Sequence, residues 1–122
     1  MPTPLVIEAF YWLSHCSTCQ KAEAFLKERG AKIQRYIDVK TESVSRTELE
    51  QLVQKIGSVE ALFSKRAMKY RQWGLDKQTL SPDEMLDYMA KEYTFIKRPV
   101  LVTKDGQILS GFSAKQYGGL FG

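Results

Sequence analysis

The sequence predicts an α/β fold with a mixed sheet, in the order β-α-β, a helical insertion, then β-β-α. Leu5–Phe10 and Ile33–Val39 are short runs rich in strand formers with a helical pattern between them, which is the order of a βαβ unit. Residues 41–97 carry helical signals only. Two more short apolar runs flank Lys104-Asp105-Gly106, and an Asp-Gly pair in that position predicts a hairpin.

The first strand, Leu5–Phe10, leads into a polar turn and is expected to be buried. The first helix should begin at the cysteine motif that follows, because apolar residues then recur at helical spacing and Gly30 stands where a left-handed residue would end the helix. These apolar residues are Ala22, Phe25 and Leu26. Ile33–Val39 is then the second strand.

Two capping sequences predict helices inside the insertion. Ser45-Arg46-Thr47-Glu48 is a capping box, and the apolar residues after it keep helical spacing up to Gly57. Ser81-Pro82-Asp83-Glu84 combines an N-cap serine, a proline at the first helical position and a reciprocal glutamate. Between them, Val59–Trp73 is interrupted by small residues and is expected to form only short helical turns.

The last part of the chain predicts two short strands, Pro99–Thr103 and Gln107–Ser110, joined by a tight turn in which Asp105-Gly106 supplies positive φ angles. Ser113–Tyr117 should begin a short final helix, since two glycines follow it. The whole order matches a thioredoxin-like core with an insertion.

Length and composition indicate one folded domain. The 122 residues are 43% apolar and 26% charged, and a chain of this size supports one hydrophobic core. We therefore expect a single domain over residues 1–122, with the insertion at about 41–97. No stretch approaches the ~20 apolar residues that cross a membrane, and Met1-Pro2-Thr3-Pro4 lacks the features of a secretory signal. The expectation is a cytoplasmic monomer without membrane association.

The net charge of +4 permits weak attraction to anionic partners. Lysines and arginines are spread from Lys21 to Lys115 and interleaved with glutamates, which predicts a solvated surface. Direct binding to nucleic acid is not expected.

Cys16-Ser17-Thr18-Cys19 carries the predicted chemistry. Cys16 falls at the start of a helix, where unpaired N–H groups and the helix dipole stabilise a thiolate, so its pKa should fall. Cys19 lies one turn later, within the range that a disulfide bridges. Two alternatives remain open: a zinc half-site, for which His15 is the one other soft ligand in the chain, and two incidental core cysteines. An intrachain metal site is not expected.

His15 and Arg98-Pro99 are the supporting candidates. His15 precedes the nucleophile and could stabilise its thiolate, or could point to solvent. A proline that opens a strand in this architecture is a candidate cis peptide, and Arg98 beside it could bring a cation to the thiolate. The alternative is a trans proline on an edge strand with an exposed arginine.

A set of motifs runs nearly from end to end of the chain: Cys16-Ser17-Thr18-Cys19-Gln20-Lys21-Ala22, Gly57, Ala61-Leu62-Phe63-Ser64-Lys65-Arg66, Ile96-Lys97-Arg98-Pro99-Val100 and Gly106-Gln107-Ile108-Leu109-Ser110-Gly111-Phe112. In these motifs the sequence resembles the arsenate reductase family, a thioredoxin-like group that also contains Spx-type regulators and YffB-like reductases.

The resemblance implies a thiol-dependent reductase in which Cys16 attacks and Arg98, before a cis-proline, holds the oxyanion. The electron donor would be a small thiol or a glutaredoxin, with glutathione as a cosubstrate and no bound cofactor. Arsenate-reducing members carry two further arginines, whose places by spacing hold Glu60 and Gly111 here. Arsenate should therefore bind weakly unless Arg66 or Arg71 supplies the missing charge.

Cys19 favours a second interpretation. Glutathione-dependent arsenate reductases of this type lack a cysteine at its place, whereas Spx-type regulators have one. The alternative function is therefore an Spx-type redox sensor in which the cysteine pair is a disulfide switch and the partner is the C-terminal domain of the RNA polymerase α subunit. A third reading is an adaptor domain in which the two cysteines are inert.

Overall fold

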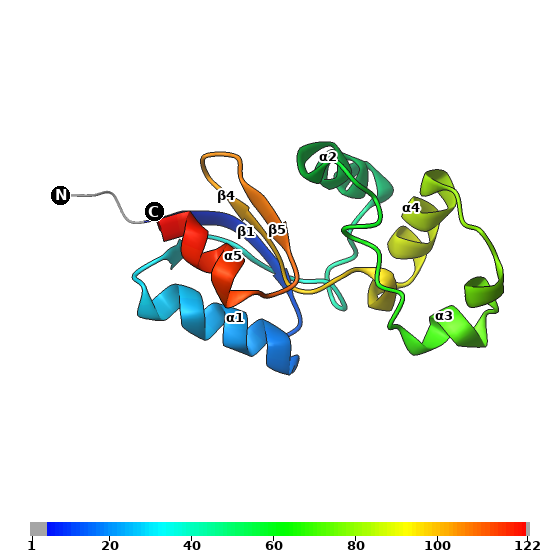
Figure 1. Cartoon of the computed structure of the whole chain (residues 1–122), viewed down its shortest axis with the longest axis horizontal. Helices are drawn as coiled ribbons and strands as arrows, with labels where there is room; N and C mark the ends of the chain where they lie inside the picture. Colours follow the sequence, from blue (N-terminus) through cyan, green and yellow to red (C-terminus); the bar gives the residue numbers. More distant parts are fainter. Residues whose placement is uncertain (1–4, 122) are drawn as a thin grey trace. The chain divides into compact units, whose positions relative to one another are not determined.

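The computed structural model describes residues 5–121 and contains two compact units (Figure 1). The first comprises the residues up to Glu42 together with those from Arg98 onward, and the second comprises Ser43–Lys97. The expected single domain with an insertion at about 41–97 stays a prediction, and Met1-Pro2-Thr3-Pro4 lies outside the described residues. No helix within residues 5–121 is long and apolar enough to cross a membrane.

The first unit is built on a mixed sheet. Its strands are β1 (Val6–Trp12), β2 (Lys32–Ile33), β3 (Tyr36–Asp38), β4 (Val100–Thr103) and β5 (Ile108–Ser110). The order is β2-β1-β4-β5, with β3 also paired to β1. β1 is parallel to β2 and β3 and antiparallel to β4, which confirms the predicted mixed sheet.

One irregularity in β1 changes the predicted strands. The register between β1 and β4 shifts between Ile7 and Ala9, as a bulge at Glu8 requires. The parallel ladder on the other side of β1 is interrupted at the same level, so the expected strand Ile33–Val39 is two short strands. The bulge also brings Ile7 and Phe10, three residues apart, into one hydrophobic cluster.

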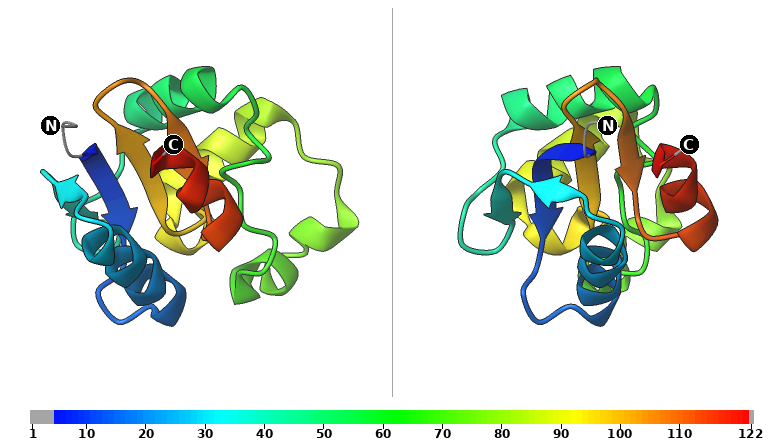
Figure 2. Two further views of the ribbon diagram at one scale, coloured as in Figure 1. Left: turned by 60° about the vertical axis from the view of Figure 1, so that its left-hand side comes forward. Right: turned by 90° about the vertical axis from the view of Figure 1, so that its left-hand side faces the viewer.

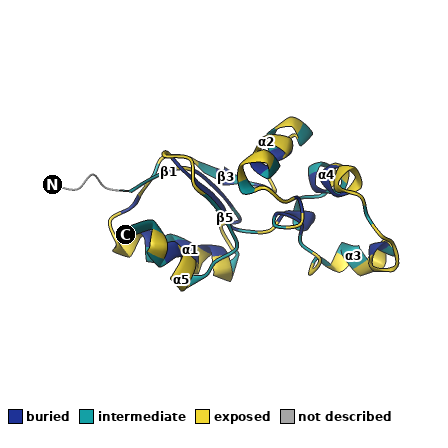
Figure 3. Ribbon diagram, turned by 45° about the horizontal axis from the view of Figure 1, so that its top comes forward, coloured by how far each residue is buried: buried dark blue, intermediate teal, exposed yellow. Residues whose placement is uncertain are grey.

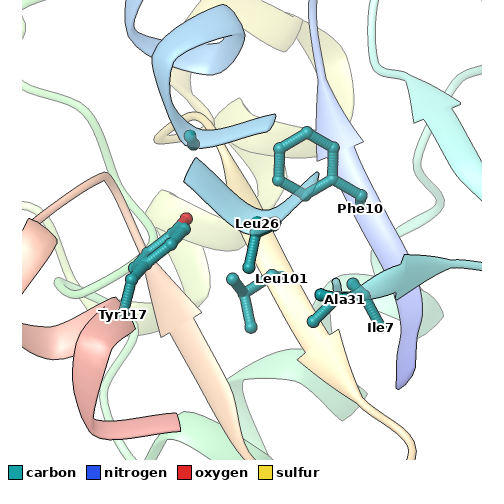
Figure 4. Close-up of a cluster of buried hydrophobic side chains, with 7 residues drawn as sticks. Ile7, Phe10, Leu26, Ala31, Leu101 and Tyr117 are labelled. Carbon is teal, nitrogen blue, oxygen red and sulfur yellow. The ribbon is translucent and has the colours of Figure 1, made fainter. Parts of the chain in front are cut away.

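Two helices cover one face of this sheet, α1 (Ser17–Glu28) and α5 (Ala114–Gly118) (Figures 1 and 2). They contact each other through the rings of Phe25 and Tyr117, whose centroids lie 6.0 Å apart. The cluster beneath them joins residues from the sheet and from both helices (Figure 4): Ile7, Phe10, Ala22, Leu26, Ala31, Leu101 and Tyr117. Gly30 follows α1 with φ +78°, the left-handed residue that the sequence predicts.

The second unit is helical, as predicted. It contains α2 (Arg46–Ile56), α3 (Met68–Gln72) and α4 (Pro82–Lys91), with the single turns η1 (Leu75–Lys77) and η2 (Tyr93–Phe95). Ser45 Oγ accepts the Glu48 N–H at 3.1 Å and starts α2, and Ser81 and Glu84 complete a reciprocal capping box at α4. Gly57 ends α2 with φ +86°.

Aromatic packing forms much of the second unit's core. The ring of Phe95 stacks on Phe63 with centroids 5.5 Å apart, and it also contacts Trp73 and Tyr88. Arg46 on α2 pairs with Asp83 and Asp87 of α4. The two longer helices, α2 and α4, are therefore joined by ion pairs.

The hairpin between β4 and β5 has the predicted position but a different turn. Gly106 has φ +98°, whereas Asp105, like the other non-glycine residues within 5–121, has no positive φ. The Gly106 N–H donates to Thr103 O at 3.1 Å and closes a four-residue turn. A tight turn followed by one left-handed glycine thus replaces a turn with two left-handed residues. The strands begin at Val100 and Ile108, one residue later than predicted.

The final helix is short, as the two glycines predict. Ser113 Oγ accepts the Gln116 N–H at 3.3 Å and starts α5. The helix ends at Gly118, and a single 3₁₀ turn, η3 (Gly119–Phe121), follows it.

Candidate active site at the cysteine pair

Cys16 is the N-cap of α1, at the end of the loop that follows β1. Its backbone is extended, with φ −84° and ψ 120°, and its side chain faces the first turn of the helix. The loop is held by two hydrogen bonds, from Cys16 N to Leu13 O at 3.1 Å and from Gln20 Nε2 to Ser14 O at 2.8 Å. The sulfur is therefore fixed at the helix terminus where the sequence predicts it.

The surroundings of Cys16 favour a thiolate. Partial burial works against ionisation, but hydrogen bonds from the Cys19 thiol and N–H, the positive charge of Arg98 and the Thr18 N–H outweigh it. Together they lower the pKa of Cys16 from its ordinary value of 9.0. The Cys19 N–H donates to Cys16 Sγ over 3.4 Å, so the sulfur takes the place that a serine or aspartate oxygen fills in an ordinary N-cap.

Cys19 has the opposite character. Its side chain is on the inner face of α1 and is 0% exposed. Burial, and then its hydrogen bond to Cys16, raise the pKa of Cys19 to about 12, although a backbone hydrogen bond from Leu13 acts in the other direction. Both cysteines are reduced. The pair therefore consists of one accessible, acidic thiol and one buried thiol that keeps its proton.

Arg98 and Pro99 lie in the same unit as the cysteines. The Arg98–Pro99 peptide bond is cis, which was one of the two predicted alternatives. Arg98 is half-buried, and its charge lowers the pKa of both cysteines. Its charge therefore acts on the thiolate, which was one of the two alternatives left open for Arg98.

The sequence did not indicate Tyr117 as a neighbour of this site, and Gly111 was named there only as the place of an absent arginine. The Gly111 N–H donates to Pro99 O at 2.7 Å, and the Tyr117 hydroxyl donates to Gly111 O at 3.0 Å. Burial, and then the negative charge of Cys19, raise the pKa of Tyr117. A chain of hydrogen bonds thus runs from the cis-proline to the final helix. No spacing pattern in the sequence predicts these hydrogen bonds, because they depend on how α5 packs on the sheet.

The two remaining predicted residues, His15 and Arg66, are both exposed. His15 is next to Cys16 but exposed. Arg66 and Glu60 are exposed residues of the second unit, so the first unit alone brings together Cys16, Cys19, Arg98 and Pro99. No group of three or more His, Cys, Asp or Glu residues within 5–121 could hold a metal ion.

Comparisons with known proteins agree on one family. Residues 11–120 match the model of the ArsC family. The Bacillus subtilis (strain 168) protein named "Uncharacterized protein YusI" is 36% identical over 112 residues, 88% of this chain and 92% of its own length. An Escherichia coli arsenate reductase is 30% identical over 97 residues, covering 79% of this chain and 68% of its own. The Lactiplantibacillus plantarum global transcriptional regulator Spx is 27% identical over 93 residues, covering 75% and 70%.

Solved structures show the same fold. An arsenate reductase from Vibrio cholerae matches with a TM-score of 0.82 at 26% identity, covering 97% of this chain and 99% of its own. The solution structure of SACOL0876 from Staphylococcus aureus matches with a TM-score of 0.77 at 32% identity, covering 93% and 96%. The predicted α/β, thioredoxin-like fold class is confirmed.

Proposed function

Because the chain belongs to the ArsC family, whose members include arsenate reductases and Spx regulators, we propose that it is a thiol-dependent oxidoreductase with Cys16 as its nucleophile. The observation that carries this proposal is the difference between the two thiols. Cys16 is accessible with a lowered pKa, whereas Cys19 is fully buried with a raised one. In thiol–disulfide exchange one cysteine attacks as a thiolate, and the other stays protonated until it resolves the mixed disulfide.

The proposed reaction has two exchanges. The Cys16 thiolate attacks one sulfur of a substrate disulfide, the S–S bond breaks, and the leaving thiolate takes a proton from solvent. The Cys19 thiol then gives up its proton and attacks Cys16 Sγ. This forms the Cys16–Cys19 disulfide and releases the second substrate thiolate, which takes up that proton. The substrate gains two electrons. Two equivalents of glutathione, or a glutaredoxin-type dithiol, return the pair to its reduced form.

Arg98 supports the nucleophile in this scheme. Its positive charge acts on both sulfurs and stabilises whichever one carries the negative charge during exchange. Pro99 follows Arg98 through a cis peptide bond, and His15 is an exposed residue next to Cys16 for which we propose a supporting role. We propose that the protein binds no cofactor or metal. We also propose that it is a monomer in the cytoplasm, where the thiol pool keeps the cysteine pair reduced.

Arsenate is not the substrate that these residues favour. Glu60 and Gly111 stand at the places of the two further arginines of arsenate-reducing members. Gly111 has φ +74°, so its backbone suits glycine and not arginine. Arg66, as a replacement cation, remains a hypothesis that an Arg66→Ala variant with arsenate would test. A small or protein disulfide is the substrate class we favour.

Trapping with Cys19→Ser tests the proposal. Without Cys19 the mixed disulfide on Cys16 has no resolving thiol and should accumulate, so incubation with lysate should leave glutathione, a glutaredoxin or a substrate protein bound to Cys16. Mass spectrometry of the adduct identifies it. Cys16→Ser is the matched control and should trap nothing. If Cys19→Ser carries no adduct and the wild type does not reduce hydroxyethyl disulfide, the proposed oxidoreductase activity is wrong.

An Spx-type redox sensor is the second candidate, supported by the similarity to Spx over 93 residues and by the hydrogen bond between the two cysteine side chains. On this reading the Cys16–Cys19 disulfide changes affinity for the C-terminal domain of the RNA polymerase α subunit. Calorimetry of the reduced and oxidised chain with that purified domain distinguishes the candidates. Stoichiometric, redox-dependent binding without reductase turnover favours the sensor, and turnover without binding favours the enzyme.

A further inference from the structure

Residues 65–77 of the second unit concentrate the positive charge of the chain. One carboxylate, Asp76, stands among five basic residues: Lys65, Arg66, Lys69, Arg71 and Lys77. The net charge of this segment is +4, the same as that of the whole chain, so the positive and negative charges of the remaining residues cancel. Lys69 pairs with Glu92 at 2.7 Å, whereas within residues 5–121 the other four basic side chains of the segment form no ion pair.

The same segment holds the large apolar side chains that are most exposed. Met68 is 77% exposed and Trp73 is 41% exposed, and within residues 5–121 no other large apolar side chain is as exposed. Helix α3, which carries Met68, has no buried residue (Figure 3). Excess charge and exposed apolar surface thus coincide in 13 of 122 residues.

The local geometry turns Met68 and Arg71 outward and leaves Trp73 partly covered. Tyr70 packs its ring on Phe63 with centroids 6.1 Å apart, so it marks the inner face of α3. Helical spacing turns Met68 and Arg71 away from that face. Trp73 packs edge-on against Phe95 at 5.5 Å, which holds the indole in place while part of it stays exposed.

We propose that residues 65–77 form a docking surface for an acidic segment of another protein, one that carries an apolar side chain among its carboxylates. Arg71 and the other unpaired cations would bind the carboxylates, and Met68, on the outer side of α3, would bind the apolar side chain. The exposed edge of Trp73, just after the helix, would add a second apolar contact for the bound segment. A fixed, half-exposed indole loses little conformational entropy when it is covered.

The composition of the surface favours a protein over other anionic partners. Trp, Met and Arg are enriched in protein interfaces, and Trp and Arg among the residues that dominate binding energy. Nucleic-acid phosphates would use the cations and leave Met68 without a role. A membrane-bound amphipathic helix presents a continuous apolar face, and the five residues of α3 cannot form one.

Fluorescence anisotropy with a defined probe tests the proposal on the full chain. The probe is a labelled synthetic peptide of glutamates interrupted by two leucines, compared with an all-glutamate peptide, single-stranded DNA and phosphatidylserine vesicles. We expect saturable binding that is tightest for the leucine-containing peptide. Lys65→Glu/Arg71→Glu should weaken it about tenfold. Met68→Ser, which changes no charge, should weaken it several-fold.

Lys40→Glu/Lys104→Glu is the matched control, because both lysines are exposed, lie outside the segment and change the net charge by the same amount. The control should bind the peptide like the wild type, and all variants should keep the wild-type melting temperature. Absence of peptide binding, an equal loss in the control, indifference to Met68→Ser, or tighter binding of DNA or vesicles would each overturn the proposal.

Discussion

The backbone N–H of Cys19 donates to the Sγ of Cys16 over 3.4 Å, so the second cysteine of the pair stabilises the ionised form of the first. The helical turn that aims this N–H also turns the Cys19 side chain into the core, where it is 0% exposed. One local geometry therefore moves the two thiol pKa values in opposite directions from 9.0.

Alkylation should distinguish the two thiols. Iodoacetamide at neutral pH should modify Cys16 in the folded, reduced protein and leave Cys19 unmodified, because Cys19 is covered and its pKa is raised to about 12. Peptide mass spectrometry after digestion measures the ratio. In urea the two cysteines should react equally, and equal reaction in the native protein would contradict the assignment of roles.

Replacing Arg98 should make Cys16 less acidic. Arg98→Met removes a positive charge that lowers the pKa of Cys16, so the alkylation rate plotted against pH should shift to higher pH. At neutral pH the variant should react several-fold more slowly. Arg35→Met, an exposed arginine of the same unit, is the control and should leave the profile unchanged. An unshifted profile in Arg98→Met would remove Arg98 from the site.

The two cysteines should also make the free energy of unfolding depend on pH, in opposite directions. The pKa of Cys16 is lower in the folded protein, so its contribution is present above the unfolded value of 9.0 and is lost as pH falls through the folded value. The pKa of Cys19 is raised to about 12, so its contribution is present below 9.0 and is lost as pH rises toward 12.

Urea unfolding between pH 6 and 11, by circular dichroism, measures both effects. Relative to wild type, Cys19→Ala should lose less stability as pH rises above about 9. Relative to wild type, Cys16→Ser should lose less stability as pH falls below 9. Parallel curves for the wild type and both variants would show that folding does not change the acidity of either thiol.

Local signals in the sequence were sufficient for much of the fold. Helix starts at Ser45 and Ser81, and left-handed glycines at Gly30 and Gly57, are decided by side chains and backbone preferences within one turn. The place of Cys16 at a helix start follows in the same way, because a strand, a polar turn and an amphipathic pattern follow one another along the chain.

Features that depend on distant contacts were not predictable. The division of Ile33–Val39 into two strands follows a bulge at Glu8 in a neighbouring strand, and no residue within the segment signals it. The link from Pro99 through Gly111 to Tyr117 likewise joins residues whose meeting depends on how the last helix packs. Propensity describes neighbours in sequence, whereas these relationships belong to the assembled sheet.

Gly111 gives the sharpest stability prediction. It has φ +74°, and a Cβ built there meets no atom within 4 Å, so the effect of Gly111→Ala comes from the backbone alone. We expect the free energy of unfolding to fall by about 1 kcal/mol in urea titrations. Gly119→Ala is the matched control, since Gly119 also meets no atom within 4 Å but has φ −62°. The control should be neutral or stabilising by up to ~1 kcal/mol.

An arginine at position 111 would carry the same backbone cost before its charge could contribute. Gly111→Arg should therefore be destabilised as much as Gly111→Ala, and the strain would pull on the hydrogen bond from Gly111 N to Pro99 O beside Arg98. Arsenate binding by calorimetry should stay weak in this variant. Tight arsenate binding with unchanged stability would mean that the backbone at Gly111 does not oppose an oxyanion site. Of the two arguments against arsenate, Glu60 and Gly111, the argument from Gly111 would then be wrong.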